Sequence, residues 1–446
     1  MKVADSNIFF NNWSQDYPSA DYGKGIYFYD TEGRRYLDGV GGIYVNSIGY
    51  GVQEIADAMA RQACKLNFSH RLRFTHEPQE QLARTISAMT PSGMERVFFT
   101  TGGSTANEMA LRMVRQYHIE RGKPGKHKVV GRWHGFHGST ISTMSMSGDE
   151  LVRKDMEPYH LNFPHIRPAN CYQCPFQLTH PGCQLACADD LATVIEREGA
   201  ETVAAFVAEP IVGGVGSALP PPSGYFAKIR TICDQYDVLF IADEVITGFG
   251  RTGKNFGLDH WQVIPDLMTT AKALSSGYAP IGAVIAHQHV WETFVTGKRK
   301  GIAMQLTYSG HPISCATALA VQEYVAKHGL IERCATIGRY LKQQLQSLAE
   351  REPLIGDVRG EGLLLGLEFV QDRTTHRPFP LARQVQQKIV QAAYDEGLIV
   401  VGRSGTGSSN DGDHLSIAPA FIISESECNE LVAMLERSIK QVAATL

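Results

Sequence analysis

Short apolar runs alternate with helical patterns through the middle of the chain. Between residues 104 and 122, Met109, Met113 and Tyr117 recur near helical spacing, and Gly122 provides a stop signal. Runs rich in Val, Ile, Leu and Phe predict buried strands at 96–101, 128–133, 203–210, 238–245 and 281–286. This alternation is typical of βαβ units and predicts an α/β fold with a mostly parallel sheet.

The pattern changes near residue 320. Helical stretches such as 335–353 then accompany two apolar strands, at 362–370 and 396–402. We therefore expect a large domain over residues 61–319 and a smaller α+β domain over residues 320–446. Residues 1–60 contain a hairpin with the polar turn Asp-Thr-Glu-Gly, and we expect this N-terminal segment to pack with the smaller domain.

Composition and charge exclude several classes of protein. The 446 residues are 43% hydrophobic and 20% charged, which is ordinary for a globular protein with more than one domain. The net charge is −4, so the chain has no basic field for a nucleic-acid partner, and a small-molecule partner is expected. No stretch is apolar for long enough to span a membrane and no leader pattern begins the chain, so we expect a cytoplasmic protein without a membrane partner.

Three ionisable residues follow predicted strands in order: Glu209, Asp243 and Lys272. The carboxyl ends of parallel strands share one edge of the sheet, where ligands bind, so these side chains are expected to converge. A lysine that is partly desolvated there has a lowered pKa and becomes a nucleophilic amine able to form a Schiff base. The alternatives are an aspartate that only caps a turn and a lysine on the surface.

Residues 98–109 predict a strand, a turn of two glycines and two hydroxyl residues, and a helix. Backbone N–H groups at such a helix start suit a phosphate, although Ser104 could simply cap the helix. The turn has neither the P-loop pattern nor the dinucleotide fingerprint. After another strand, Phe136 could stack on a flat cofactor ring, whereas His137 and Phe136 could also be core residues.

A phosphate site, an amine nucleophile and a buried aspartate together are what pyridoxal phosphate requires. The chain resembles the class III pyridoxal-phosphate-dependent aminotransferases, a fold type I family. The resemblance covers nearly the whole chain, and the motifs that carry it occur in the family's order: TGGSTANE, GFHGST, AEPIVGGVG, FIADEVITGFGRTG, TTAKALSSGYAPIGAV and LTYSGHPISCATALA. It implies a large domain with a mostly parallel seven-stranded sheet, a smaller α+β domain and the cofactor pyridoxal 5'-phosphate.

The resemblance also implies roles for individual residues around the cofactor ring. Lys272 would be the catalytic lysine that binds the cofactor aldehyde, and Asp243 would hold the pyridine nitrogen. Phe136 and Val245 would lie on the two faces of the ring, and His137 would lie beside it.

The remaining implied contacts concern the phosphate and the cofactor oxygen. Gly103, Ser104 and Thr105 would hold the phosphate, and Thr307 would reach the phosphate of a neighbouring subunit. The resemblance therefore implies a homodimer, or a dimer of dimers. Glu209 would lie beside the cofactor oxygen or a substrate-binding arginine.

Some positions depart from the family pattern or select a branch within it. Thr105 replaces a usual glutamate, and Ile246 stands where ornithine- and γ-aminobutyrate-type members carry glutamine, which is similar to the ω-amino acid:pyruvate branch. That branch has a mobile arginine for the acceptor's carboxylate, and Arg403 is the candidate here, with a solvated loop arginine as the alternative. The Gly- and Ser-rich residues 404–411 that follow predict a mobile loop. Tyr44 is expected in the substrate pocket.

The nine cysteines are scattered, which fits reduced thiols better than a disulfide framework. Cys171, Cys174, Cys183 and Cys187 form the exception, with a C-x2-C-x8-C-x3-C spacing that is compatible with a zinc site. One loop is shorter than in common zinc modules. We therefore expect no metal and favour a thiol-rich loop that can be oxidised.

These features predict an aminotransferase that moves an amino group from an amine or ω-amino acid to a keto acid such as pyruvate by a ping-pong mechanism. Within the family, the alternative is internal transfer or racemisation by an aminomutase or an amino-acid or lactam racemase. Outside the family, Glu209, Asp243 and Glu244 could be metal ligands of a hydrolase, or the chain could be a catalytically silent binding protein.

Overall fold

The computed structural model describes residues 3–405 and 411–446. Residues 406–410, within the predicted mobile loop, lie outside the described residues. The larger sheet contains strands β4 Met94–Thr100, β5 Lys128–Trp133, β6 Ser147–Gly148, β7 His165–Ile166, β8 Val203–Ala208, β9 Leu239–Asp243, β10 Leu267–Thr270 and β11 Gly282–His287.

Within the described residues, seven of these strands form one row in the order β4, β11, β10, β9, β8, β5 and β6, and β7 adds an eighth beside β5. Strand β11 is antiparallel to both of its neighbours, and the other pairs are parallel. The predicted α/β fold with a mostly parallel sheet is therefore confirmed.

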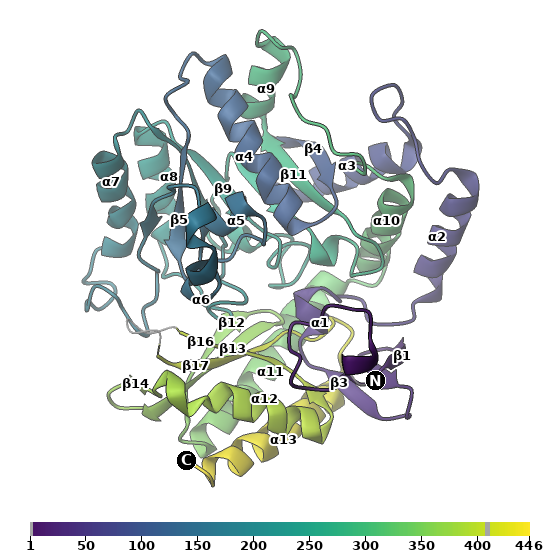
Figure 1. Cartoon of the computed structure of the whole chain (residues 1–446), viewed down its shortest axis with the longest axis vertical. Coiled ribbons are helices and arrows are strands. Elements are labelled where there is room, and N and C mark those ends of the chain that lie inside the picture. The colour runs from purple at the N-terminus through teal and green to yellow at the C-terminus, as the bar shows by residue number, and fades with distance from the viewer. Residues whose placement is uncertain (1–2, 406–410) are drawn as a thin grey trace.

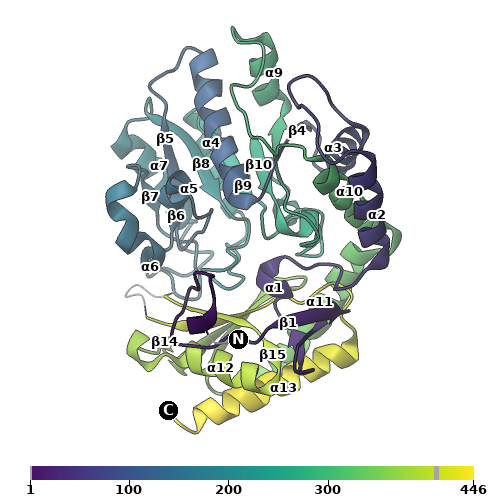
Figure 2. The same cartoon turned by 45° about the vertical axis from the view of Figure 1, so that its right-hand side comes forward.

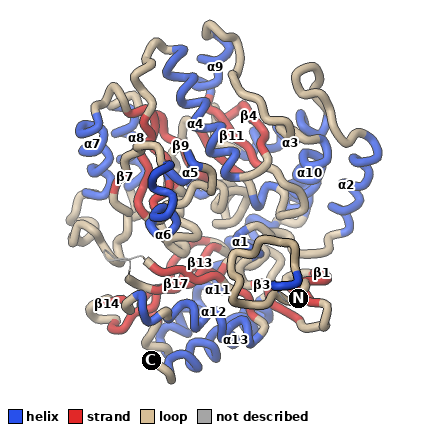
Figure 3. Tube along the Cα trace, viewed as in Figure 1, coloured by secondary structure: helices blue, strands red, loops and turns tan. Residues whose placement is uncertain are grey.

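Helices cover both faces of this sheet, as Figure 3 shows by colour. The helices that belong to this part of the chain or adjoin it are α2 Gln53–Lys65, α3 Glu77–Met89, α4 Gly103–Glu120, α5 Ile141–Met146, α6 Glu150–Arg153, α7 Ala186–Glu198, α8 Tyr225–Gln235, α9 Gln288–Thr296 and α10 Pro312–Lys327. Along the central strands, Phe206 and Phe240 pack in the same core as α7 and α8, whereas Val207 and Ile241 pack in the core of α4. Two buried faces explain why these strands are apolar throughout.

A second, antiparallel sheet lies below the first in Figure 1. Its order is β12, β13, β17, β16, with β14 beside β13, and the bounds are β12 Ile355–Glu361, β13 Leu364–Asp372, β14 Arg377–Pro378, β16 Val401–Ser404 and β17 Asp413–Ile417. One hydrophobic core joins this sheet to α11 Leu330–Arg351, α12 Val385–Glu396 and α13 Glu425–Ala443.

The N-terminal segment forms a sheet with a strand from near the other end of the chain (Figure 2). Strands β1 Ala20–Lys24, β2 Tyr27–Asp30 and β3 Arg35–Asp38 are antiparallel, and β15 Leu398–Ile399 joins β3 in parallel with Leu37 opposite Leu398. The apolar stretch 396–402 therefore divides into two strands in different sheets, because β16 pairs with β17 instead. The domain boundaries near residues 60 and 320 stay a prediction.

Among the described helices, none is both long enough and apolar enough to cross a membrane.

Candidate active site

Three neighbouring strands deliver the ionisable side chains that the sequence singled out. Strands β8, β9 and β10 are adjacent and parallel. Glu209 follows β8, Asp243 ends β9, and Lys272 lies two residues beyond β10 at the start of a 3₁₀ turn, Lys272–Leu274. Glu209 and Asp243 are buried, with 3% and 2% of their surfaces exposed, whereas Lys272 is half-buried. The structure thus brings the expected acid, acid and amine to one edge of the sheet.

The amine of Lys272 lies against the ring of Tyr44. Its Nζ is 5.1 Å from the ring centroid, and Tyr44 is buried in the short turn α1, Gly41–Tyr44. Burial lowers the pKa of Lys272 to about 8, although the charges of Glu209 and Asp243 act in the opposite direction. Both Lys272 and Tyr44 have positive φ, at 45° and 60°, a strained backbone that side chains rarely adopt and that concentrates at functional sites.

A buried hydrogen-bond network fixes the carboxylate of Asp243. His137 Nδ1 lies 2.7 Å from Asp243 Oδ2, and Asn107 Nδ2 donates to the same oxygen at 2.8 Å. Asn107 also donates to the backbone carbonyl of His137 and accepts from Thr269 Oγ1, both at 2.8 Å. The backbone N–H of Val245 donates to Asp243 Oδ1 at 3.1 Å. The aspartate therefore has several fixed contacts in the interior and no freedom to turn away.

Glu209 holds two backbone segments in place. Its Oε1 accepts the N–H of Phe136 at 3.0 Å, and its Oε2 accepts the N–H of Gly213 at 2.9 Å. Burial raises the pKa of Glu209 above its ordinary value, while the charge of His137 and these two N–H groups act to lower it. Glu209 thus sets the position of the loop that carries Phe136.

The start of α4 leaves room for an anion. The first N–H groups of a helix have no intrahelical acceptor, and α4 begins at Gly103 with Ser104 and Thr105 next. A Cβ added to Gly102 would meet no atom within 4 Å, whereas one added to Gly103 would lie 2.8 Å from Val245 Cγ1. The space before the helix is open, and Gly103 is needed for the close approach of Val245. The Thr105 hydroxyl donates to the Gly102 carbonyl at 2.9 Å.

Phe136 and Val245, the two expected ring contacts, are both half-buried and lie on the loops after β5 and β9. Phe136 packs against the small cluster of Val212, Val215 and Leu219. The side chain of Phe136 is therefore supported on one side, and both side chains retain exposed surface.

Glu244 does not point to this site. Its fully buried carboxylate accepts the N–H groups of Gly257 and Leu258 at 2.8 and 2.9 Å and the hydroxyl of Thr247. Burial raises the pKa of Glu244 to about 7. The alternative in which Glu209, Asp243 and Glu244 bind a metal is wrong, because Glu244 serves the backbone of a neighbouring turn.

Thr307 and Arg403 were also expected at the site. Thr307 is exposed on the segment before α10. Arg403 lies on β16 and forms an ion pair with Asp149, the residue directly after β6. Tyr44, in contrast, lies at the centre of the site.

Sequence reasoning missed Asn107, Asp149 and Arg251. Asn107 lies three residues before Ala110 and seven before Val114, both fully or almost fully buried, so a polar residue on the core face of the helix was the available signal. Arg251 is fully buried and donates to the carbonyls of Asn46, Leu363, Ala418 and Pro419, which joins the N-terminal segment, the large domain and the small domain.

The four loop cysteines all carry free thiols. Burial raises the pKa of Cys187 to about 11, and the other three thiols add to this effect. Within residues 3–405 and 411–446, no group of three or more His, Cys, Asp or Glu side chains is placed to hold a metal ion. The zinc alternative gains no support from this arrangement.

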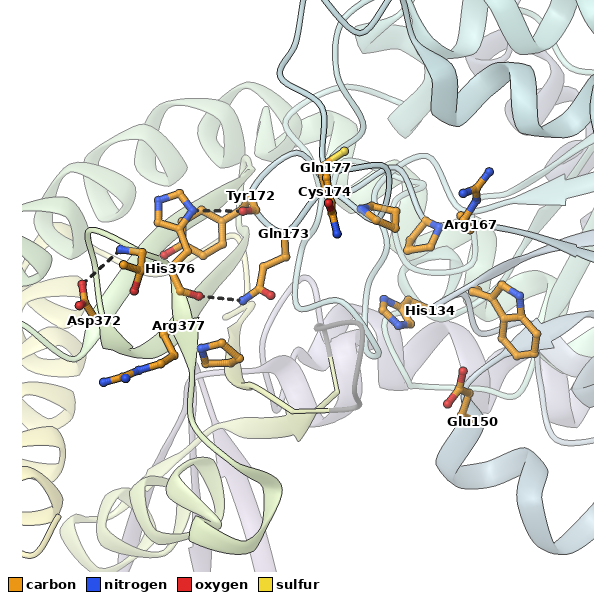
Figure 4. Close-up of a pocket in the computed structure, with 15 residues that line it drawn as sticks. His134, Glu150, Arg167, Tyr172, Gln173, Cys174, Gln177, Asp372, His376 and Arg377 are labelled. Atoms are coloured by element: carbon orange, nitrogen blue, oxygen red, sulfur yellow. Dashed lines mark hydrogen bonds between the residues drawn. The ribbon is translucent and has the colours of Figure 1, made fainter.

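A cavity of about 880 Å³ borders the same loop (Figure 4). Tyr172 and Cys174 line it from the loop that follows β7, and Asp372 and His376 line it from the end of β13 and the turn between β13 and β14. The ring of His376 stacks on Tyr172 with the centroids 4.2 Å apart. Neither Lys272 nor Asp243 lines this cavity, so the chemistry of the strand ends lies elsewhere.

Comparisons with known proteins agree with this geometry. A family model described as aminotransferase class-III matches residues 10–439. An uncharacterized aminotransferase of Bacillus subtilis is 39% identical over 97% of each chain. The putrescine–pyruvate aminotransferase of Pseudomonas aeruginosa is 36% identical over 95% of this chain and 90% of its own. The crystal structure of an (S)-enantioselective ω-transaminase from Thermomicrobium roseum superposes with a TM-score of 0.91, at 33% identity over 99% of this chain and 97% of its own.

Proposed function

We propose a reaction for this chain from one premise: the chain belongs to the class III aminotransferases. In this reaction an amine or an ω-amino acid gives its amino group to a keto acid such as pyruvate, in two half reactions at one site. The observation that carries the proposal is the amine of Lys272, with its lowered pKa, at the same sheet edge as the fixed carboxylate of Asp243. The putrescine–pyruvate activity of the Pseudomonas relative supports the choice of substrates.

The described residues fit pyridoxal 5'-phosphate. The open space before α4 suits the phosphate, which Gly103, Ser104 and Thr105 would hold. Asp243 would hold the pyridine nitrogen, and Lys272 would bind the aldehyde. When bound, the cofactor supplies an aldehyde that condenses with primary amines and a protonated ring that accepts electrons from the substrate carbon.

Lys272 is the base in this proposal. A pKa of about 8 leaves part of its amine neutral near neutral pH. Nζ could therefore take a proton from the amino-bearing carbon of the donor and deliver it to the cofactor carbon. The ring of Tyr44 covers Nζ on one side and limits the positions that the free amine can adopt.

Asp243 would hold the pyridine nitrogen of the cofactor in its protonated form. His137 and Asn107 both bind the same carboxylate oxygen, so the charge of Asp243 stays in one place. Glu209 positions Phe136, which together with Val245 would exclude water from the ring faces.

The proposed active unit is a homodimer in which Thr307 reaches the site of the other subunit. Thr307 is exposed, and the apolar side chains of Phe68, Leu72, Phe74 and Tyr308 are exposed as well. The rings of Phe68 and Tyr308 lie 6.2 Å apart, so Phe68 lies on the same region of surface as Tyr308, the residue next to Thr307. An exposed apolar surface of this kind suits a protein–protein interface.

Arg403 is the proposed binding group for the acceptor's carboxylate. A guanidinium can donate two parallel hydrogen bonds to the two oxygens of a carboxylate. A ketone or aldehyde without a carboxylate has only its single carbonyl oxygen to accept them. Arg403 can bind the carboxylate of an ω-amino acid donor in the same way.

The test is alanine formation by the purified holoenzyme with pyruvate and a panel of donors, among them 1,4-diaminobutane and 4-aminobutyrate. We expect alanine to form only when donor and pyruvate are both present, in amounts equal to the donor consumed. The Lys272→Ala protein is the control. If the donor isomerises or racemises without pyruvate, the chain has the alternative function of an aminomutase or racemase.

A further inference from the structure

Arg403 and Asp149 form an ion pair between the two domains. Asp149 follows β6 and is 4% exposed, and it caps α6 by accepting the N–H of Val152 at 3.4 Å. Its second carboxylate oxygen binds the guanidinium of Arg403, whose side chain is 35% exposed. Strand β6 also carries Ser147, whose hydroxyl accepts the N–H of His137 at 2.8 Å. Asp149 is thus tied to the loop that holds the candidate site.

Arg403 is held differently from the buried arginines of the same domain interface. Arg251 donates to four backbone carbonyls, and Arg359 binds Glu368, Asp357 and two further carbonyls. Within the described residues, Asp149 alone accepts hydrogen bonds from Arg403. The guanidinium of Arg403 can therefore reorient by breaking this one contact. Arg251 and Arg359 would each have to break several contacts.

The guanidinium lies within electrostatic reach of the site. Burial raises the pKa of Tyr44 to about 12, and the positive charge of Arg403 acts against this rise. Because the Tyr44 ring also covers the amine of Lys272, Tyr44 connects the position of Arg403 to the reacting atoms. His414, which is opposite Arg403 on β17, is buried with its pKa far below the ordinary value, so it adds no competing positive charge.

We propose that Asp149 is a specificity-determining residue that competes with the acceptor's carboxylate for Arg403. The inference rests on the proposed function, in which Arg403 binds that carboxylate. When the acceptor carries a carboxylate, Arg403 leaves Asp149 for the substrate. When the substrate is uncharged, Arg403 stays with Asp149 and its charge remains neutralised. Asp149 thereby weakens the binding of keto acids and lets the same site accept aldehydes and amines that carry no carboxylate.

The test replaces Asp149 by Asn in the holoenzyme. Asparagine keeps the cap of α6, because its side-chain oxygen also accepts the N–H of Val152. We expect the KM for pyruvate to fall about fivefold, which is the scale of a partly exposed ion pair, while kcat with pyruvate and the KM for propanal stay within about twofold. Calorimetric binding of propanoate, a carboxylate without the keto group, should tighten by the same factor. Asp149→Ser, which can also cap the helix, should change both quantities in the same direction.

The matched control is Asp155→Asn, which removes the same charge from an exposed position on the following turn and should leave all these values unchanged. In the double variant Asp149→Asn/Arg403→Ala, the effect of the Asn substitution should vanish. An unchanged or raised KM for pyruvate in Asp149→Asn, or an effect that persists without Arg403, would overturn the inference. If Arg403→Ala alone leaves the KM for pyruvate unchanged, the proposed carboxylate-binding role of Arg403 fails as well.

Discussion

Two regions of the molecule hold charged side chains in opposite ways. At the strand ends of the large domain, Asp243 is buried and receives hydrogen bonds from His137, Asn107 and the backbone of Val245. At the junction with β16, the guanidinium of Arg403 is partly exposed and, among the residues that the structure describes, binds one side chain, Asp149.

The difference matches the roles that are proposed for the two charges. A carboxylate that controls the protonation of a ring must stay in one place, and buried contacts to several donors prevent rotation. A guanidinium that serves both charged and uncharged substrates must change partners, which a single, partly solvated contact permits at low cost. The number of contacts per charge therefore separates fixed groups from movable ones in this chain.

We expect the largest effect from Lys272→Ala, which changes the region of fixed charges. The variant loses the proposed base beside Asp243, so we expect the rate of the half reaction to fall by about a thousandfold or more. The proposed phosphate-binding residues at the start of α4 remain, so equilibrium dialysis should still detect bound pyridoxal phosphate. Turnover at the wild-type rate would show that another residue is the nucleophile.

Asp243→Asn tests the fixed carboxylate itself. The neutral amide cannot keep the pyridine nitrogen protonated, whereas the phosphate contacts and Lys272 are untouched. We expect the first half reaction, measured by stopped-flow absorbance, to slow by at least about a hundredfold with the cofactor retained. If the rate stays within a few-fold of wild type, the carboxylate serves the fold alone.

The last test compares how much Arg251 and Arg403 each contribute to the free energy of unfolding, and the effect at Arg403 is the smallest that we expect. Arg251→Met leaves buried carbonyls without donors, and we expect a loss of about 3 kcal/mol or more in the free energy of unfolding. Arg403→Met should lose no more than about 1 kcal/mol, because its single contact is partly solvated. Urea denaturation of both variants at equal cofactor content measures the difference. Equal losses would mean that Arg403 is as firmly built into the fold as Arg251.

The sequence was sufficient to predict the fold class and the convergence of the strand ends. Uninterrupted apolar runs require two buried faces, and Phe206 and Val207 do pack on opposite faces of the sheet. Parallel neighbours then place Asp243 and Lys272 at one edge, whatever the details of the loops. The comparisons with known proteins confirm the family that the motifs indicated.

Contacts between distant segments were beyond sequence reasoning. Asn107 reaches Asp243 only because of the way α4 crosses β9 and β10, and no periodicity encodes that angle. Asp149 meets Arg403 across two domains. The division of residues 396–402 between two sheets depends on β3, whose pairing with β15 is set by tertiary packing. Glu244 was open as a metal ligand beside Asp243, yet it binds a neighbouring turn, because adjacent residues at a strand end point in different directions.

The pairing of β3 with β15 also dictates an order of events during translation. Leu37 leaves the ribosome well before its partner Leu398, because residues 38–397 are made between them. Until then the edge of β3 has no neighbour, and Ile26 and Leu37 lack the core that α11, α12 and α13 later provide. The large domain can form first, and the small domain closes last. A nascent chain that stalls before residue 398 therefore carries an open strand edge at β3, which is a site for aggregation.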